Sequence, residues 1–168
     1  MDVRNESKPG ANRTAVQRKS DREVVVTRAF DVPARLVFEA WTKPALFTQW
    51  WVPRSMGMTL RSCTLDVRVG GRYRLEFGGD PANPMAFFGK YLEVTPPSRL
   101  VWTNEESGDG GSVTTVTLEE KDGRTHLVLS ELYPTKEALD AAGTGAQDAL
   151  SETFGQLDEL LVTLSASR

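Results

Sequence analysis

The residue types that most often carry chemistry are scarce in this chain. It has one histidine, His126, and one cysteine, Cys63, which cannot form the usual zinc cluster of several Cys and His ligands. In the stretch "RTHLVLS", Thr125, Leu127 and Leu129 alternate on the face expected to be buried, so His126 should point outward. No local signature supports a catalytic Cys–His pair. Such a pair could form only if the fold brought the two side chains together. We expect both residues to be structural, with no catalytic residue, metal or cofactor.

The acidic and glycine-rich stretches carry no clearer catalytic pattern. Glu105-Glu106 and Glu119-Glu120 are neighbours only along the chain, and adjacent side chains diverge in a strand or turn, so neither pair forms an acid–base dyad. Gly70-Gly71 and the glycines of 108–111 lack the spacing and helix context of a phosphate-binding loop. The sequence therefore favours a protein without enzymatic activity, while leaving an enzyme open.

Aromatic residues give the positive signal. The stretch "LFTQWWVPRSMGM" places Trp50 and Trp51 side by side before a proline. Such residues either fill a core or form the wall of a cavity, where Tyr and Trp also offer a polar group to a ligand. We expect one tryptophan of the pair to anchor the neighbouring helices and Trp51 to lie at a cavity mouth. The other aromatic residues that could face the same interior are Tyr73, Phe77, Phe88, Trp102 and Phe154.

The elements that must position these residues follow from the periodicity of the chain. A β-branched strand is expected from about Glu23 to Val32, followed by two short helices in "PARLVFEAWTKP" and "PALFTQWW", each opened by a proline. A series of alternating segments then predicts an antiparallel meander: "MTLRSCTLDVRV", "RYRLEF", "MAFFGKYLEV", "RLVWTNE", "VTTVTLEE" and "THLVLSEL". Loops are expected in "GGDPANP" and "SGDGGS". "TKEALDAAG" predicts a short helix.

A long amphipathic helix is expected from Ala146 to near the C-terminus. Its apolar stripe is Leu150, Phe154, Leu157, Leu160, Leu161 and Leu164, whereas Gln156 and the acidic residues lie largely away from it. A six- or seven-stranded sheet with one apolar face needs a cover, and this helix is the large element available. The pattern predicts an α+β fold in which a curved antiparallel sheet encloses a long C-terminal helix.

Composition and charge restrict the class of protein. The 168 residues are 39% hydrophobic and 26% charged, as in a globular domain. Residues 1–20 hold five basic and two acidic side chains, which leaves 15 basic against 21 acidic for residues 21–168, so a nucleic-acid partner is not expected. We expect a flexible basic tail over 1–20 and a single domain over 21–168. One cysteine, no signal-peptide pattern and no membrane-length apolar run favour the cytoplasm.

Several segments together resemble a known superfamily. "RAFDVPARLVFEAWTKPALFTQWWVP", "DVRVGGRYR", "GKYLEVTPPSRLVWT" and "GAQDALSETFGQLDELL" are similar to START-like (SRPBCC, Bet v 1-like) helix-grip proteins over roughly residues 22–165. The branch resembles the family named after the C-terminal domain of the activator of the heat-shock-protein-90 ATPase. The resemblance implies a strand, two small helices in a V, a six-stranded sheet and a long C-terminal helix.

The resemblance implies three functions, because relatives carry hydrophobic ligands, act as cyclases, or stimulate a chaperone in the stress response. We predict a domain that binds a small hydrophobic or amphipathic ligand, as a monomer or homodimer. The predicted cavity-lining residues are Trp51, Met58, Tyr73, Phe77, Trp102, Phe154 and Leu157. The first alternative is a chaperone-interacting module that uses the outer sheet face (Arg72, Arg74, Glu76) and the basic tail. The second is a cyclase- or hydrolase-type enzyme that uses interior acids or Tyr73.

Overall fold

The computed structural model describes residues 13–58, 60–78, 85–105 and 111–166. The strands are β2 Ala15–Arg18, β3 Glu23–Phe30, β4 Leu60–Leu65, β5 Arg72–Phe77, β6 Met85–Thr95, β7 Arg99–Thr103, β8 Val113–Lys121 and β9 Arg124–Leu132. The helices are α1 Ala34–Thr42, α2 Pro44–Phe47, the 3-10 turn η2 Arg54–Met56, α3 Lys136–Ala142, α4 Gly145–Asp148 and α5 Leu150–Ala166. The loops expected at 78–84 and 107–112 lie almost entirely outside the described residues.

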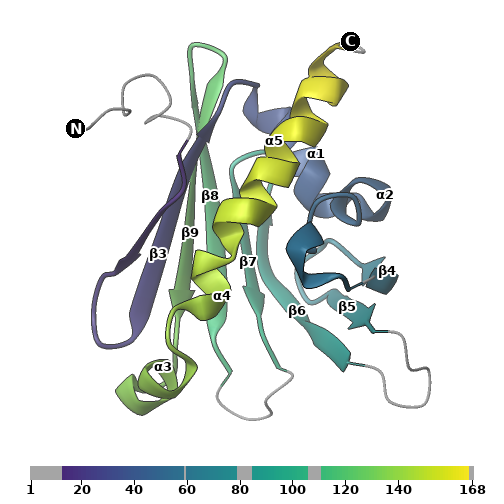
Figure 1. The fold of residues 1–168 in the computed structure, drawn as a ribbon. Coiled ribbons are helices and arrows are strands. Elements are labelled where there is room, and N and C mark those ends of the chain that lie inside the picture. Colours follow the sequence, from purple (N-terminus) through teal and green to yellow (C-terminus); the bar gives the residue numbers. More distant parts are fainter. Residues whose placement is uncertain (1–12, 59, 79–84, 106–110, 167–168) are drawn as a thin grey trace.

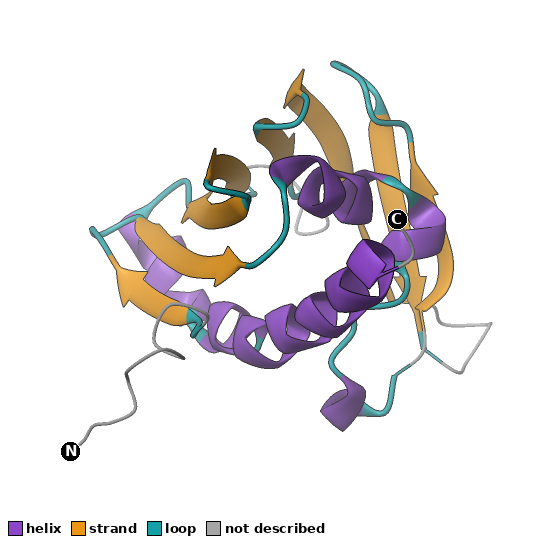
Figure 2. Ribbon diagram, turned by 90° about the horizontal axis from the view of Figure 1, so that it is seen from above, coloured by secondary structure: helices purple, strands orange, loops and turns teal. Residues whose placement is uncertain are grey.

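All the strands form one antiparallel sheet, in the order β2-β3-β9-β8-β7-β6-β5-β4. The sheet curves around α5, and α1 and α2 lie on the same side of it (Figures 1 and 2). This is the predicted helix-grip arrangement. The sheet has eight strands instead of six or seven, because β2 adds a strand at the edge beyond β3.

Strand β2 lies within residues 1–20, over which a flexible tail was expected. Ala15–Arg18 pairs with β3, with Ala15 opposite Thr27 and Arg18 opposite Val24. The segment "AVQR" does not alternate between apolar and polar residues, but an edge strand needs only one pairing partner. Residues 1–12 of the expected tail lie outside the described part of the chain.

The two short helices are separated at a proline, as expected. The chain leaves α1 at Lys43, and Pro44 opens α2 at the first helical position, where its missing N–H costs nothing. Helix α2 ends at Phe47 and the chain continues through turns, so the second helix is shorter than predicted. Trp50 anchors this region: it is fully buried, and its Nε1 donates to the carbonyl of Ala40 over 3.0 Å.

Helix α5 supplies the predicted apolar stripe, but it begins later than expected. The chain forms the separate turn α4 before α5 starts at Leu150. Phe154, Leu157 and Leu161 are fully buried against the sheet and α1. Gln156 is also buried, which the sequence did not predict, because its amide bonds to the chain that follows α2. In the described residues, no helix is long and apolar enough to cross a membrane.

Candidate functional site

A cavity of about 230 Å³ lies between the concave face of the sheet and the helices. Most of its lining is aromatic or aliphatic. The aromatic members are Trp41, Phe47, Trp51, Tyr73, Phe87, Tyr91 and Trp102, the other apolar ones are Leu65, Leu75, Leu100, Leu129, Ala146 and Leu150, and the polar ones are Asn104, Thr114, Glu131 and Gln147. Phe87 of β6 and Ala146 of α4 are the lining residues that are exposed to solvent.

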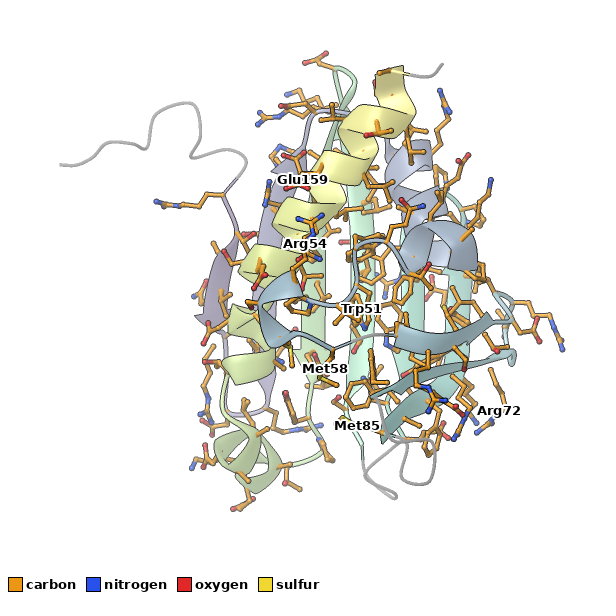
Figure 3. The ribbon with its side chains drawn as sticks, turned by 45° about the vertical axis from the view of Figure 1, so that its right-hand side comes forward. Trp51, Arg54, Met58, Arg72, Met85 and Glu159 are labelled. Carbon is orange, nitrogen blue, oxygen red and sulfur yellow. The ribbon has the colours of Figure 1, made fainter. Side chains whose placement is uncertain are left out.

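The cavity brings together three of the residues predicted to line it. Trp102 projects from β7 and Tyr73 from β5, and both face inward because their strands alternate as expected. Trp51 lies on the segment between α2 and η2 (Figure 3). Its ring stacks on Phe47, with centroids 4.9 Å apart, and meets the ring of Trp41 at 5.7 Å. Trp50 and Trp51 therefore divide the two roles considered for them: one is a core anchor, and the other lines the cavity.

The structure places the other four predicted residues around the cavity without including them in its lining. Phe154 and Leu157 are fully buried, and the Phe154 ring packs edge-on against Phe30 at 6.0 Å, so they belong to the packed core. Phe77 contacts Phe87 at 5.2 Å from the neighbouring strand. Met58 is partly buried and packs against the core, below Trp51 in Figure 3.

Strand register explains why Phe87 lines the cavity and Phe88 does not. Phe87 pairs with Leu75, whose side chain is buried, whereas Phe88 pairs with the exposed Arg74. Paired residues of antiparallel strands share a face of the sheet. Phe88 accordingly lies on the outer face, with the Arg74 guanidinium carbon 5.5 Å from its ring centroid. Phe88 was expected to face inward, and this was wrong: the neighbouring residue, Phe87, faces inward instead.

A set of hydrogen bonds from α5 fixes the segment that carries Trp51. Gln156 Nε2 donates to the carbonyls of Trp50 and Val52, over 3.0 and 2.9 Å, and its Oε1 accepts from the backbone N–H of Arg54 over 2.8 Å. Glu152 accepts from both the N–H and the hydroxyl of Ser55, over 2.9 and 2.5 Å. These bonds hold the wall of the cavity against the helix.

An exposed ion pair lies beside these hydrogen bonds. Arg54 lies next to Glu159 on α5 (Figure 3), with nitrogen and oxygen 3.1 Å apart. Both side chains are about two-thirds exposed, so solvent screens the pair, and the buried amide of Gln156 is the stronger attachment.

One end of the cavity is polar. Asn104 follows β7, and its Nδ2 donates to Thr114 Oγ1 over 2.8 Å and to Ser112 Oγ over 3.0 Å. The hydroxyl of Tyr73 donates within the same network, 3.0 Å from Asn104 Oδ1 and 2.7 Å from the carbonyl of Thr103. This network holds Tyr73 in position at the boundary between the apolar and the polar lining.

Glu131 and Gln147 complete the polar end. Glu131 accepts from Ser112 Oγ over 2.7 Å and from Gln147 Nε2 over 3.2 Å. Gln147 Nε2 also donates to the Tyr133 hydroxyl over 3.0 Å. Gln147 Oε1 is buried, and no donor among the described residues lies within hydrogen-bonding distance of it; the same holds for the buried indole N–H of Trp41. Both atoms belong to residues that line the cavity.

The residues considered first for chemistry are arranged as structural groups. His126 is exposed, and Cys63 is separated from it in the sheet by four strands. Burial raises the pKa of the Cys63 thiol to about 11, which suppresses the reactive thiolate. Burial also raises the pKa of Tyr91. Glu120 accepts from the first N–H of α1, on Ala34, over 2.9 Å, so it caps a helix. Within the described ranges, no group of His, Cys, Asp or Glu is arranged to hold a metal ion.

The polar lining residues were missed in the sequence, although one signal was present. The inward-facing alternation Thr125, Leu127, Leu129 of β9 continues two residues further to Glu131. Extending the alternation would have placed a carboxylate on the concave face. Thr114 precedes Val116 and Leu118 in the same way on β8. Gln147 had no such signal, because the four-residue helix α4 was expected to be part of the long helix.

A curved antiparallel sheet that encloses a C-terminal helix, with a largely apolar cavity between them, defines a START-like (SRPBCC, helix-grip) domain. The family model described as "Activator of Hsp90 ATPase homolog 1-like protein" matches residues 31–162. The chain belongs to this family, as its sequence motifs indicated.

Solved structures of similar proteins support the same fold. A protein from Rhodobacter sphaeroides is 25% identical with a TM-score of 0.79, and the match covers 90% of this chain and 99% of that one. A protein from Nitrosomonas europaea is 25% identical with a TM-score of 0.76 and covers 88% and 99%. An AHSA1-like protein from Aeromonas hydrophila is 20% identical with a TM-score of 0.64 and covers 80% and 92%. No curated protein matches the chain.

Proposed function

We propose that the protein binds a small hydrophobic or amphipathic molecule in the cavity between sheet and helix. The observation that carries this proposal is the aromatic lining of a cavity of about 230 Å³ between the sheet and the helices. Ligand sites are typically concave, mostly apolar and equipped with a few polar groups, and their volumes are usually about 300–1,000 Å³. The smaller volume here favours a ligand of one or two rings. The single cysteine favours a reducing compartment, so the proposal includes a cytoplasmic location.

The residues have two roles in this proposal. Trp51, Tyr73 and Trp102 contact the ligand directly, because they line the cavity. Phe77, Phe154, Leu157 and Met58 support the wall from behind, because they pack in or against the core outside the lining.

The first test is native mass spectrometry of the purified protein, compared with its denatured mass. An additional mass that leaves on denaturation would identify a co-purified ligand class. A panel of one- and two-ring aromatic compounds is then titrated against the wild type, Trp102→Leu and the control Val162→Ala, whose side chain is 62% exposed on α5. We expect Trp102→Leu to change affinity several-fold and the control to leave it unchanged. Equal affinities in all three folded proteins would contradict the proposal.

A chaperone-interacting role is the second candidate, and the name of the family favours it. The outer-face charges considered for such a role already form ion pairs within the chain: Arg72 with Glu105 at 3.0 Å, and Arg74 with Glu76 at 2.7 Å. A partner would have to compete with these pairs. Binding of the purified protein to a purified chaperone of the heat-shock-protein-90 class, with stimulated ATP hydrolysis, would support this role. No binding at micromolar concentrations would count against it.

A further inference from the structure

The polar side chains of the cavity are concentrated at one end. Trp102, Thr114 and Glu131 lie opposite one another in a single row across β7, β8 and β9. Residues paired in this way share a face, and Thr114 is buried at 3% exposure, so Glu131 also faces the interior. Gln147 reaches the row from α4, next to Ala146, which also lines the cavity. Within this row, the aromatic ring of Trp102 and the carboxylate of Glu131 are therefore separated by one strand, β8.

The amide donors at this end, Asn104 Nδ2 and Gln147 Nε2, already bond to acceptors of the protein, so a ligand would meet acceptor atoms here. An ionised carboxylate such as that of Glu131 can only accept. Because Gln147 places a side-chain atom 3.2 Å from that carboxylate, the atom must be the amide nitrogen, and the amide oxygen must lie on the other side. That oxygen, Gln147 Oε1, is buried without a donor among the described residues. A buried acceptor in this state is unfavourable, and a donor on a ligand would satisfy it.

The charge of the lining discriminates between possible head groups. Among the described residues of the lining, Glu131 is the one charged side chain, and none of them is Lys, Arg or His. An anionic head group would therefore bury a second negative charge close to the first, without a cation in the lining to balance it. The indole N–H of Trp41 is a donor, but it is neutral and single, and it lies in the aromatic part of the lining. This neutral donor does not balance the negative charge of a ligand carboxylate.

We propose that the ligand is a neutral or cationic amphiphile whose hydroxyl or amine donates hydrogen bonds to Glu131 and Gln147, and that anionic amphiphiles are rejected. Its apolar body lies among the aromatic residues around Trp41 and Trp102. The donor group lies at the polar end, beside Glu131 and Gln147. This inference rests on the proposed function and adds the chemical class of the ligand.

The test uses four compounds with the same ring system: naphthylmethylamine, naphthylmethanol, methylnaphthalene and naphthoate. Their dissociation constants are measured at pH 7 by calorimetry for the wild type, Glu131→Gln and the control Glu119→Gln, which changes an exposed carboxylate of β8. We expect the wild type and the control to bind the amine and the alcohol about tenfold or more tightly than naphthoate, since charge-assisted hydrogen bonds contribute on this scale. In Glu131→Gln, the ratio of amine to naphthoate affinity should fall about tenfold, while methylnaphthalene affinity stays within about twofold.

The outcomes separate this inference from the function on which it rests. If none of the four compounds binds, the proposed function and this inference both fail. If methylnaphthalene binds but naphthoate binds as tightly as the amine, or the ratio is the same in Glu131→Gln, this inference alone is overturned. If Glu131→Gln does not fold, Gln147→Met replaces it. That variant should reduce the preference for naphthylmethanol over methylnaphthalene, and an unchanged preference would overturn the inference.

Discussion

Gln156 offers the sharpest test of how the cavity wall is held. Its side chain is 5% exposed, and its amide makes three hydrogen bonds to the backbone of residues 50–54. Gln156→Leu keeps a side chain of similar size but removes every one of these bonds. The carbonyls of Trp50 and Val52 and the N–H of Arg54 then lose their partner in a region that water reaches only in part.

The expected loss follows from these contacts. A hydrogen bond of this kind contributes about 1 kcal/mol, and a buried group left without a partner costs about 1–3 kcal/mol. The three bonds of Gln156 together predict a decrease of about 3 kcal/mol in the free energy of unfolding. For a chain of this length, that corresponds to a melting temperature lower by about 6–12 °C.

The assay is urea unfolding of the wild type, Gln156→Leu and the control Glu159→Gln. The control removes the ion pair with Arg54, whose partners are 65% and 66% exposed, so it should cost less than about 1 kcal/mol. Cavity ligands should also bind more weakly to Gln156→Leu, because Trp51 belongs to the segment that is released. If Gln156→Leu is no less stable than Glu159→Gln, the buried amide does not hold this segment, and the reasoning is refuted.

Four further predictions rest on burial and backbone geometry. Leu157→Ala should lower the free energy of unfolding by about 2–5 kcal/mol, since Leu157 is fully buried; a loss below about 1 kcal/mol in urea unfolding would contradict its place in the core. With its pKa raised from 9.0 to about 11, Cys63 should hold about a hundredfold less thiolate at pH 8 than an ordinary thiol, and iodoacetamide labelling should accelerate on unfolding. Because the pKa of Cys63 is higher in the folded protein, its contribution to the free energy of unfolding should be intact below pH 9 and decline between pH 9 and 11. Urea unfolding of Cys63→Ala should show a smaller decline over this range. Gly155→Ala, in α5 with open space around it, should stabilise by about 0.5–1 kcal/mol, whereas Gly89→Ala should destabilise because its Cβ would lie 2.0 Å from the carbonyl oxygen of Thr103; thermal melts that rank the two variants the other way would contradict this.

The fold was predictable because its signals are local and repeated. Alternation in "RYRLEF" and "THLVLSEL" assigns the inward faces of β5 and β9, and the spacing of Phe154, Leu157 and Leu161 assigns the buried face of α5. Strand β2 was missed because four residues at a sheet edge carry almost no periodic signal, and their strand depends on β3 beside them.

The cavity was only partly predictable, because alternation tells which face a residue occupies but not what lies opposite it. Trp102 and Phe77 both face the concave side, yet only Trp102 borders the open space. That difference depends on where the helices cover the sheet, which is a property of the whole fold. The polar role of Gln156 depends likewise on the carbonyls of a turn that has no periodic pattern of its own.

Strand β9 carries the observation behind the proposed class of ligand. Along its inward face, Leu127 is fully buried, Leu129 is buried but borders the cavity, and Glu131 places a carboxylate in the cavity lining. A core closed by its own side chains would be expected to continue with leucine, because a buried polar group has to be paired to be tolerated. Here the carboxylate is held by Ser112 and Gln147, while the amide oxygen of Gln147 stays without a donor. This acceptor belongs to a residue of the cavity lining, and on the ligand class proposed above a hydroxyl or an amine would supply the donor.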